Sequence, residues 1–418
     1  MIQDNQEKPL PALSGTPNRW DESLLRIWAV TTIALMVLSW KLWIPAGTDY
    51  PRVPLLNFDQ SLLEILQYIA SATLVLGLIT TTIMPRRIKT TVTMIACGFA
   101  ISFLCNQHGL QPWAWQAFII ATLLRCLPLP DAKKWIAWLM ISIYLYSAIG
   151  KFDYQFVNSL GRVFLGVICK WFGLNWNGND LVAPWLVLAF PLGEFLIGIG
   201  LIFQRTRRLA AFLAIALHLL LIAILSPIGL RHRWPVLIWN GLSIALVCWL
   251  FLATGPKRIK ILQRLPGKNQ TMISHKLGVA FALLVLLGPL LRPIQLWDHW
   301  LAWGLYSPSN SRVELFLPDS TRAKLRAQQL ETYLMDDHVF GRNRTGIPKF
   351  ALDKFTLDEL GVPIYPQASF QKTVATEFLR QHGLLDDCRL DELGPSNPRT
   401  GDRTRTQVDL SRERWGAP

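Results

Sequence analysis

The chain has 418 residues, of which 51% are hydrophobic and only 17% are charged, and it contains 18 tryptophans. With several apolar runs of about 20 residues, this composition predicts an all-α polytopic membrane protein rather than a soluble one. The net charge of +14 lies entirely in residues 1–291, because residues 292–418 carry 17 basic and 17 acidic side chains. Excess cations in loops between spans set membrane topology, so we expect no nucleic-acid partner.

The apolar runs predict about nine transmembrane helices. They cover residues 24–43, 61–84, 90–106, 112–127, 135–150, 181–203, 209–227, 234–254 and 275–291. If the tail 1–23 is cytoplasmic, the inner segments hold 18 Lys and Arg residues and the outer segments hold 7. This distribution satisfies the positive-inside rule. We therefore expect a multi-pass protein of the cytoplasmic (inner) membrane, embedded in the bilayer over 24–291, with the N-terminus inside and the C-terminus outside.

Two regions outside the expected spans differ in composition from the loops: residues 156–176 and the segment after residue 291. Residues 156–176 are apolar and aromatic with helical spacing but are too interrupted to cross, which predicts an interfacial or re-entrant segment. Residues 292–390 mix a strand-like alternation near 311–317 with helical spacing over 321–333 and 368–381. They predict a small extracytoplasmic α+β domain. Residues 391–418 have little apolar content, and we expect them to be disordered.

The six cysteines do not form a C-x-x-C pair. Several lie in or beside apolar runs, where a free thiol behaves as a small hydrophobic side chain. We expect inert thiols and no metal site. A bridge between Cys105 and Cys169 on the outer side is geometrically conceivable, and the sequence alone does not decide it.

Glu194 is the most informative residue for function. It lies near the middle of the run 181–203, which is otherwise free of charge. An ionisable residue inside a membrane span is costly and is a functional-site hypothesis by default. Pro191 and Gly193 beside it favour a kink in the helix.

Neighbouring spans place further polar residues at related depths. Lys151 ends the span 135–150 at the outer face, and His218 lies in the middle of the span 209–227. If the four spans from 135 to 254 form one bundle, these side chains can line a cavity that opens outward. We predict Lys151, Glu194 and His218 as catalytic residues. The predicted substrate- or cofactor-binding residues are Asp153, Arg231, His232, Arg233 and Asn240.

Each of these residues also has a purely structural alternative. Lys151 can snorkel at a helix end. Glu194 and Asn240 can lock helices together, and His218 can bridge two helices by hydrogen bonds. The basic residues at 231–233 can contact lipid headgroups.

Short motifs in this region resemble a known family. Tyr144–Phe152 (YLYSAIGKF) and Pro191–Leu220 (PLGEFLIGIGLIFQRTRRLAAFLAIALHLL) are similar to the four-helix core of the DoxX/MauE superfamily, over residues of about 137–254. Gly150-Lys151, Glu194 and Thr206-Arg207 occupy its motif positions. The wider architecture is similar to HTTM proteins, the group that includes vitamin K-dependent γ-carboxylases.

The resemblance implies quinone-linked or thiol redox chemistry, or carboxylation driven by a reduced quinone. Quinone is the implied cofactor, and in the carboxylase case the implied base is Lys151. The thiol branch would need paired cysteines, and the sequence has no C-x-x-C pair. The sequence therefore leaves two hypotheses: a quinone-linked or carboxylase-like enzyme with an outward-facing intramembrane site, and a non-catalytic membrane scaffold that presents its C-terminal domain to an envelope partner.

Overall fold

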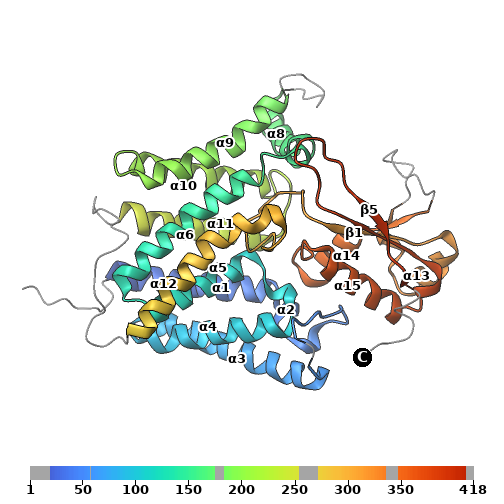
Figure 1. Cartoon of the computed structure of the whole chain (residues 1–418), viewed down its shortest axis with the longest axis horizontal. Helices are drawn as coiled ribbons and strands as arrows, with labels where there is room; N and C mark the ends of the chain where they lie inside the picture. Colours follow the sequence, from blue (N-terminus) through green and yellow to red (C-terminus); the bar gives the residue numbers. More distant parts are fainter. Residues whose placement is uncertain (1–18, 57, 175–182, 254–271, 336–346, 411–418) are drawn as a thin grey trace, which may run out of the picture.

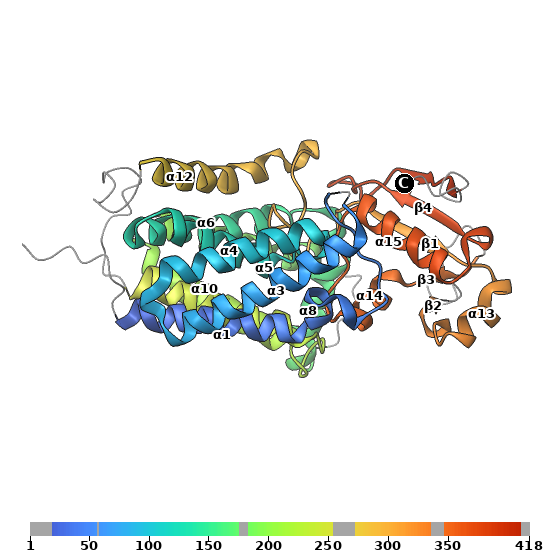
Figure 2. The same cartoon turned by 90° about the horizontal axis from the view of Figure 1, so that it is seen from below.

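The computed structural model describes residues 19–56, 58–174, 183–253, 272–335 and 347–410. A bundle of long helices forms one part of the molecule, and a small α+β domain covers one end of that bundle (Figures 1 and 2). Most of the expected N-terminal tail, the basic cluster near 257–268 and residues 175–176 of the expected interfacial segment lie outside the described residues.

The bundle and the segments that join its helices contain the following helices. They are α1 (Arg19–Leu38), α2 (Trp40–Trp43), α3 (Gln60–Ile83), α4 (Ile88–Cys105), α5 (Pro112–Cys126), α6 (Leu129–Ile149), α7 (Tyr154–Asn158), α8 (Leu160–Trp171), α9 (Ala183–Ile202), α10 (Arg207–Leu225), α11 (Trp234–Val247) and α12 (Met272–Leu287). A π-helical turn at Cys248–Leu252 extends α11, and a 3-10 helix at Gly288–Ile294 extends α12. Several helices begin with a proline in the first turn, where its missing N–H has no helical partner to lose.

Six helices are long and apolar enough to cross a membrane, judged by length and composition. They cover Gln60–Ile83, Pro85–Cys105, Pro184–Ile202, Arg207–Leu225, Trp234–Leu252 and Met272–Ile294. A seventh span is counted if Leu129–Ile149 and Tyr154–Trp171, which are bent by 68° at their junction, form one broken span or a re-entrant loop. The described residues are therefore compatible with a multi-pass membrane protein, but the nine expected spans are not confirmed.

The expected spans that are not confirmed have clear physical shortcomings. Helix α5 has 15 residues, which reach about 22 Å at 1.5 Å per residue and fall short of a hydrocarbon core of about 30 Å. Helix α1 carries Arg19, Asp21, Glu22 and Arg26 near its start. Apolar content alone does not distinguish a full crossing from a helix buried within a bundle.

Helix packing follows the order of the chain in the part that the resemblance covers. Helix α6 packs against α9, α9 against α10, and α10 against α11. The four helices expected to form one bundle therefore do so. Helices α3 and α4 pack against each other, α3 also against α1, and α4 also against α5. The α3 and α4 backbones come close because Gly77 and Gly98 have no side chain between them.

Three connections between the helices contact the C-terminal domain. Tyr50 Oη lies 2.8 Å from Thr356 Oγ1, and Gln107 Nε2 donates to Gln367 Oε1 at 2.7 Å. Similar contacts involve His108 with the Pro363 carbonyl and Arg233 with Asp358. The loops expected on the outer side thus gather at one end of the bundle, under the domain that was also expected outside.

The C-terminal domain contains a five-stranded antiparallel sheet in the order β2-β3-β1-β4-β5. Its strands are β1 (Arg312–Phe316), β2 (Leu334–Met335), β3 (Lys349–Phe350), β4 (Arg389–Leu393) and β5 (Arg405–Gln407), and its helices are α13 (Arg322–Ala327), α14 (Leu352–Leu360) and α15 (Ala368–Gln381). Helix α15 packs against β1 and β4 through a buried face that includes Phe370, Val374 and Phe378. The α+β class expected for this part is confirmed.

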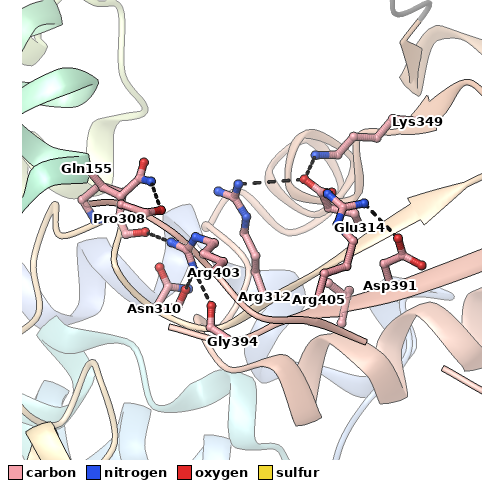
Figure 3. Close-up of polar contacts among 12 residues, drawn as sticks. Gln155, Pro308, Asn310, Arg312, Glu314, Lys349, Asp391, Gly394, Arg403 and Arg405 are labelled. Carbon is pink, nitrogen blue, oxygen red and sulfur yellow. Dashed lines mark hydrogen bonds and ion pairs between the residues drawn. The ribbon is translucent and has the colours of Figure 1, made fainter. Parts of the chain in front are cut away.

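The prediction of a disordered tail from residue 391 is wrong for residues 391–410. This segment forms β5 and a strap along the bundle side of the sheet, where Gln155 Nε2 of α7 donates to the Gly401 carbonyl at 2.9 Å (Figure 3). Arg403 donates to the carbonyls of Pro308, Asn310 and Gly394, and burial lowers its pKa to about 10. Polar side chains such as Arg403, which the sequence suggests are exposed to solvent, instead form hydrogen bonds within the protein. Residues 411–418 lie outside the described residues.

We expect Arg403→Lys to loosen the strap, because an ammonium lacks the fork of N–H donors that reaches three carbonyls at once. Limited proteolysis followed by mass spectrometry should detect cleavage within residues 394–410 roughly tenfold faster than in the unmodified protein, as expected for a locally opened segment. Arg399→Lys, on the exposed part of the same strap, is the matched control. Equal cleavage rates in the two variants would show that Arg403 does not hold the strap.

Candidate functional site

An ion pair joins α6 and α9 at the end of the bundle nearest the C-terminal domain. Lys151 Nζ donates to Glu194 Oε2 at 2.5 Å and to Ser147 Oγ at 2.7 Å. Ser147 lies one helical turn before Lys151, so both face α9. The side chains of Lys151 and Glu194 are 10% and 13% exposed. The two residues singled out separately in the sequence are therefore direct partners.

The apolar surroundings make loss of this ion pair more costly than loss of a surface salt bridge. Helix α9 carries no charged residue other than Glu194 in Ala183–Ile202. A charge in an apolar setting is tolerated when it is paired and hydrogen-bonded. Removal of one partner leaves the other without compensation, which costs far more than an exposed pair contributes.

A second polar chain crosses α6, α10 and α11. Tyr144 Oη lies 2.8 Å from His218 Nε2, and His218 Nδ1 lies 2.8 Å from Asn240 Oδ1. Asn240 Nδ2 already donates to the Val236 carbonyl, which leaves Oδ1 as an acceptor. His218 therefore carries a proton on Nδ1, and its Nε2 is hydrogen-bonded to the Tyr144 hydroxyl.

The Lys151–Glu194 pair and the Tyr144–His218–Asn240 chain lie close to each other. Tyr144 lies on α6, and Lys151 follows the end of this helix seven residues later, so both lie on the same side of it. The Glu194 carboxylate is close enough to interact electrostatically with both Tyr144 and His218. Lys151, Glu194, His218 and Asn240 are thus brought together, as expected from the sequence.

Asp153 takes a different place from the one expected. Its Oδ1 accepts from the backbone N–H groups of Gln155 and Phe156 at 2.8 and 3.4 Å and so caps α7. Its Oδ2 is buried without a hydrogen-bond partner among the described residues, near the guanidinium groups of Arg292 and Arg403. The structure gives Asp153 a capping role at the junction of α6 and α7.

The basic residues before α11 line a cavity of about 700 Å³ between the bundle and the C-terminal domain. Arg231, His232 and Arg233 form part of its wall, and Arg233 pairs with Asp358 at 2.7 Å. Burial lowers the pKa of His232, so its ring is neutral at pH 7. The described residues that line this cavity do not include Lys151 or Glu194. The sequence analysis expected one cavity lined by all of these residues. In the structure, Lys151 and Glu194 lie between helices, and Arg231, His232 and Arg233 line a separate cavity.

A few residues lie between the Lys151–Glu194 pair and the cavity. Ser307 lines the cavity, and its hydroxyl donates to the Gly150 carbonyl at 2.6 Å, next to Lys151. Arg292 lies over Gly150, where a Cβ atom would come within 2.8 Å of its guanidinium, and it donates to Ser309. A side chain at position 150 would therefore displace the Arg292 guanidinium.

The sequence analysis missed several residues of this region. Tyr144 and Ser147 lie seven and four residues before Lys151, a helical spacing that could have identified both. The cavity wall supplied by Trp300, Tyr306 and Arg312 could not have been found, because their approach to the bundle depends on the fold of the C-terminal domain.

The described residues contain neither a metal-ligand cluster nor a disulfide bridge. Within the described ranges, no three His, Cys, Asp or Glu residues are grouped so that they could hold a metal ion. All six cysteines are free thiols, so Cys105 and Cys169 are not bridged in this structure.

No family model, no curated protein and no solved structure matches this chain. The likeness to DoxX/MauE and HTTM proteins stays a prediction that depends on short motifs around Lys151 and Glu194.

We expect the Lys151–Glu194 pair to behave as a unit in unfolding measurements. Lys151→Met and Glu194→Leu should each lower the free energy of unfolding by about 3 kcal/mol, because each leaves a buried charge unpaired. The double variant should recover most of that loss. Unfolding in mixed detergent micelles would measure all three. Single-variant effects that simply add in the double variant would show that the two groups are not coupled.

Proposed function

We propose that this chain is an integral membrane enzyme that binds a quinone-class ligand at the outer end of α6, α9, α10 and α11. Lys151 and Glu194 would move protons to and from that ligand. The observation that carries the proposal is the buried Lys151–Glu194 pair, joined to Ser147 and next to the Tyr144–His218–Asn240 chain. The motif resemblance over residues 137–254 supports the choice of a quinone.

The cavity beside the pair fits a planar aromatic head in size and lining. Ligand pockets of this kind occupy about 300–1,000 Å³ and combine aromatic walls with few polar groups. Trp113, Trp239, Trp300 and Tyr306 contribute to its wall, with Arg231 and neutral His232 as polar groups. A bound quinone would supply redox chemistry coupled to proton uptake and release.

The protein's own residues would manage the protons. In an apolar setting the charged pair and the neutral amine–acid pair lie closer in free energy than in water, because charge is costly there. Lys151 can therefore release or regain a proton while Glu194 compensates. His218 can take up a proton on Nε2 through the Tyr144 hydroxyl, while its Nδ1–H stays hydrogen-bonded to Asn240. Gly150 and Ser307 separate this group from the cavity, so the Ser307 contact must open for Lys151 to reach a ligand.

Charge distribution supports an outward-facing site. Arg86, Arg125, Lys133 and Arg207 belong to the ends of helices remote from the C-terminal domain, and basic residues favour the cytoplasmic side. The C-terminal domain and the cavity would then face the outside of an inner or cytoplasmic membrane.

A second candidate function follows from one specific observation. Lys151 and Glu194 are each other's partner and do not line the 700 Å³ cavity. This arrangement is also what a purely structural lock requires. The chain would then be a non-catalytic scaffold that presents residues 295–410 to an envelope protein.

The experiment compares two buried ion pairs. Glu194→Gln should abolish quinone reduction-linked activity in membranes and reduce quinone in lipid extracts of the purified protein. Asp21→Asn is the matched control, because Asp21 pairs with Lys133 at 2.7 Å and is 7% exposed, at the other end of the bundle. We expect both variants to lose stability, of the order of 3 kcal/mol, and only Glu194→Gln to lose the quinone-linked readouts.

Two results would contradict the enzyme. The first is the absence of quinone from the unmodified purified protein. The second is full complementation of a deletion strain by Glu194→Gln, which would favour the scaffold.

A further inference from the structure

A second cavity, of about 1040 Å³, lies at the same end of the bundle on the side of α3. Its wall combines the segment 45–54, the first turns of α3, and the α14 and α15 helices of the C-terminal domain. The proposed quinone chemistry does not use this cavity.

The walls of this cavity are held together by packing between the two parts of the molecule. The Tyr50 hydroxyl lies 2.8 Å from Thr356 Oγ1, and the Tyr50 ring stacks on Phe355 with centroids 5.9 Å apart. Phe378 of α15 packs against Phe355 in turn. The lining is therefore built from fixed elements on both sides, with aromatic faces between polar groups.

The charged lining is predominantly acidic. Glu359 is partly neutralised by Lys41, whose Nζ lies 3.3 Å from its carboxylate, and Glu377 by Arg380. Asp49 and Glu64 form no ion pair and no side-chain hydrogen bond among the described residues. Arg52 lies near Glu64 but donates to the Ile44 carbonyl.

Besides the Asp49 and Glu64 carboxylates, the wall of this cavity contains a buried hydrogen-bond acceptor. Gln67 lines the cavity and is 1% exposed, and its Oε1 has no hydrogen-bond partner in the described structure. Its Nε2 donates to the Trp43 carbonyl at 3.1 Å and to Ser71 and Ser102. The Trp43 carbonyl can only accept, so the amide orientation is fixed and Oε1 is left as an unpaired acceptor within the wall. An unpaired buried acceptor is costly, and a donor from a ligand would satisfy it.

We propose that this cavity binds a primary ammonium group. Carboxylates and an amide oxygen accept hydrogen bonds, and an ammonium offers three donors with a positive charge. Tyr50, Phe355 and Phe378 contribute apolar side chains to the wall, which suit the alkyl stem of an amine. Exposed Phe58 and Leu62 beside the start of α3 place the opening next to the apolar surface. The ammonium can therefore belong to a soluble amine or to an aminolipid headgroup.

The test uses purified protein in nanodiscs of phosphatidylcholine and phosphatidylglycerol. One arm titrates 1,5-diaminopentane by calorimetry, and the other adds phosphatidylethanolamine and counts retained lipid by native mass spectrometry. We expect saturable binding in at least one arm. The double variant Asp49→Asn/Glu64→Gln should weaken it about tenfold, equivalent to about 1.4 kcal/mol. Both changed side chains are exposed, so the fold should not depend on them.

Two further variants separate the site from general charge effects. Gln67→Met keeps the side-chain length and removes the acceptor, and it should also weaken binding. Asp358→Asn removes one negative charge from α14 outside this cavity and should leave binding unchanged. Absence of saturable binding in both arms, or equal affinity in the double variant and the Asp358→Asn control, would overturn the proposal.

Discussion

The pairing of Lys151 with Glu194 is the constraint on which the rest of the arrangement depends. A carboxylate within an apolar helix needs a partner, and Lys151 Nζ at 2.5 Å provides it. This contact fixes the register of α6 against α9. Because α9 packs against α10 and α10 against α11, it also fixes where His218 and Asn240 can meet Tyr144.

The end of α6 joins the helix cluster to the C-terminal domain. Gly150 accepts a hydrogen bond from Ser307 and leaves space for Arg292, while Asp153 caps α7 three residues later. The strap at residues 394–410 then holds α7 from the other side through Gln155. A change at the ion pair can thus reach the cavity wall through a few residues, without movement of the whole bundle.

The sequence predicted the parts of this structure that depend on local chemistry. A lone carboxylate in an apolar run identified Glu194, and helical periodicity gave the limits of α15 to the residue. It did not predict the strap, because Arg403 and Arg405 look solvated until the carbonyls and carboxylates that they contact are known.

The separation of the two cavities from the ion pair also lay beyond the sequence. It depends on where residues 300–312 and 349–371 of the C-terminal domain contact the bundle, and hydrophobic periodicity does not predict such long-range contacts. The expected nine spans are not confirmed for a related reason, since α5 has only 15 residues and its apolar side chains are largely buried in the bundle.

The protonation state of Glu194 distinguishes proton transfer from a purely structural ion pair. Infrared difference spectra of the protein in nanodiscs, recorded before and after reduction of added quinone, would report this protonation state. If Glu194 transfers protons, a carboxyl band changes on reduction and is absent from the difference spectrum of Glu194→Gln. A spectrum without any carboxyl change at Glu194 would contradict a role in proton transfer and leave the ion pair as a structural lock.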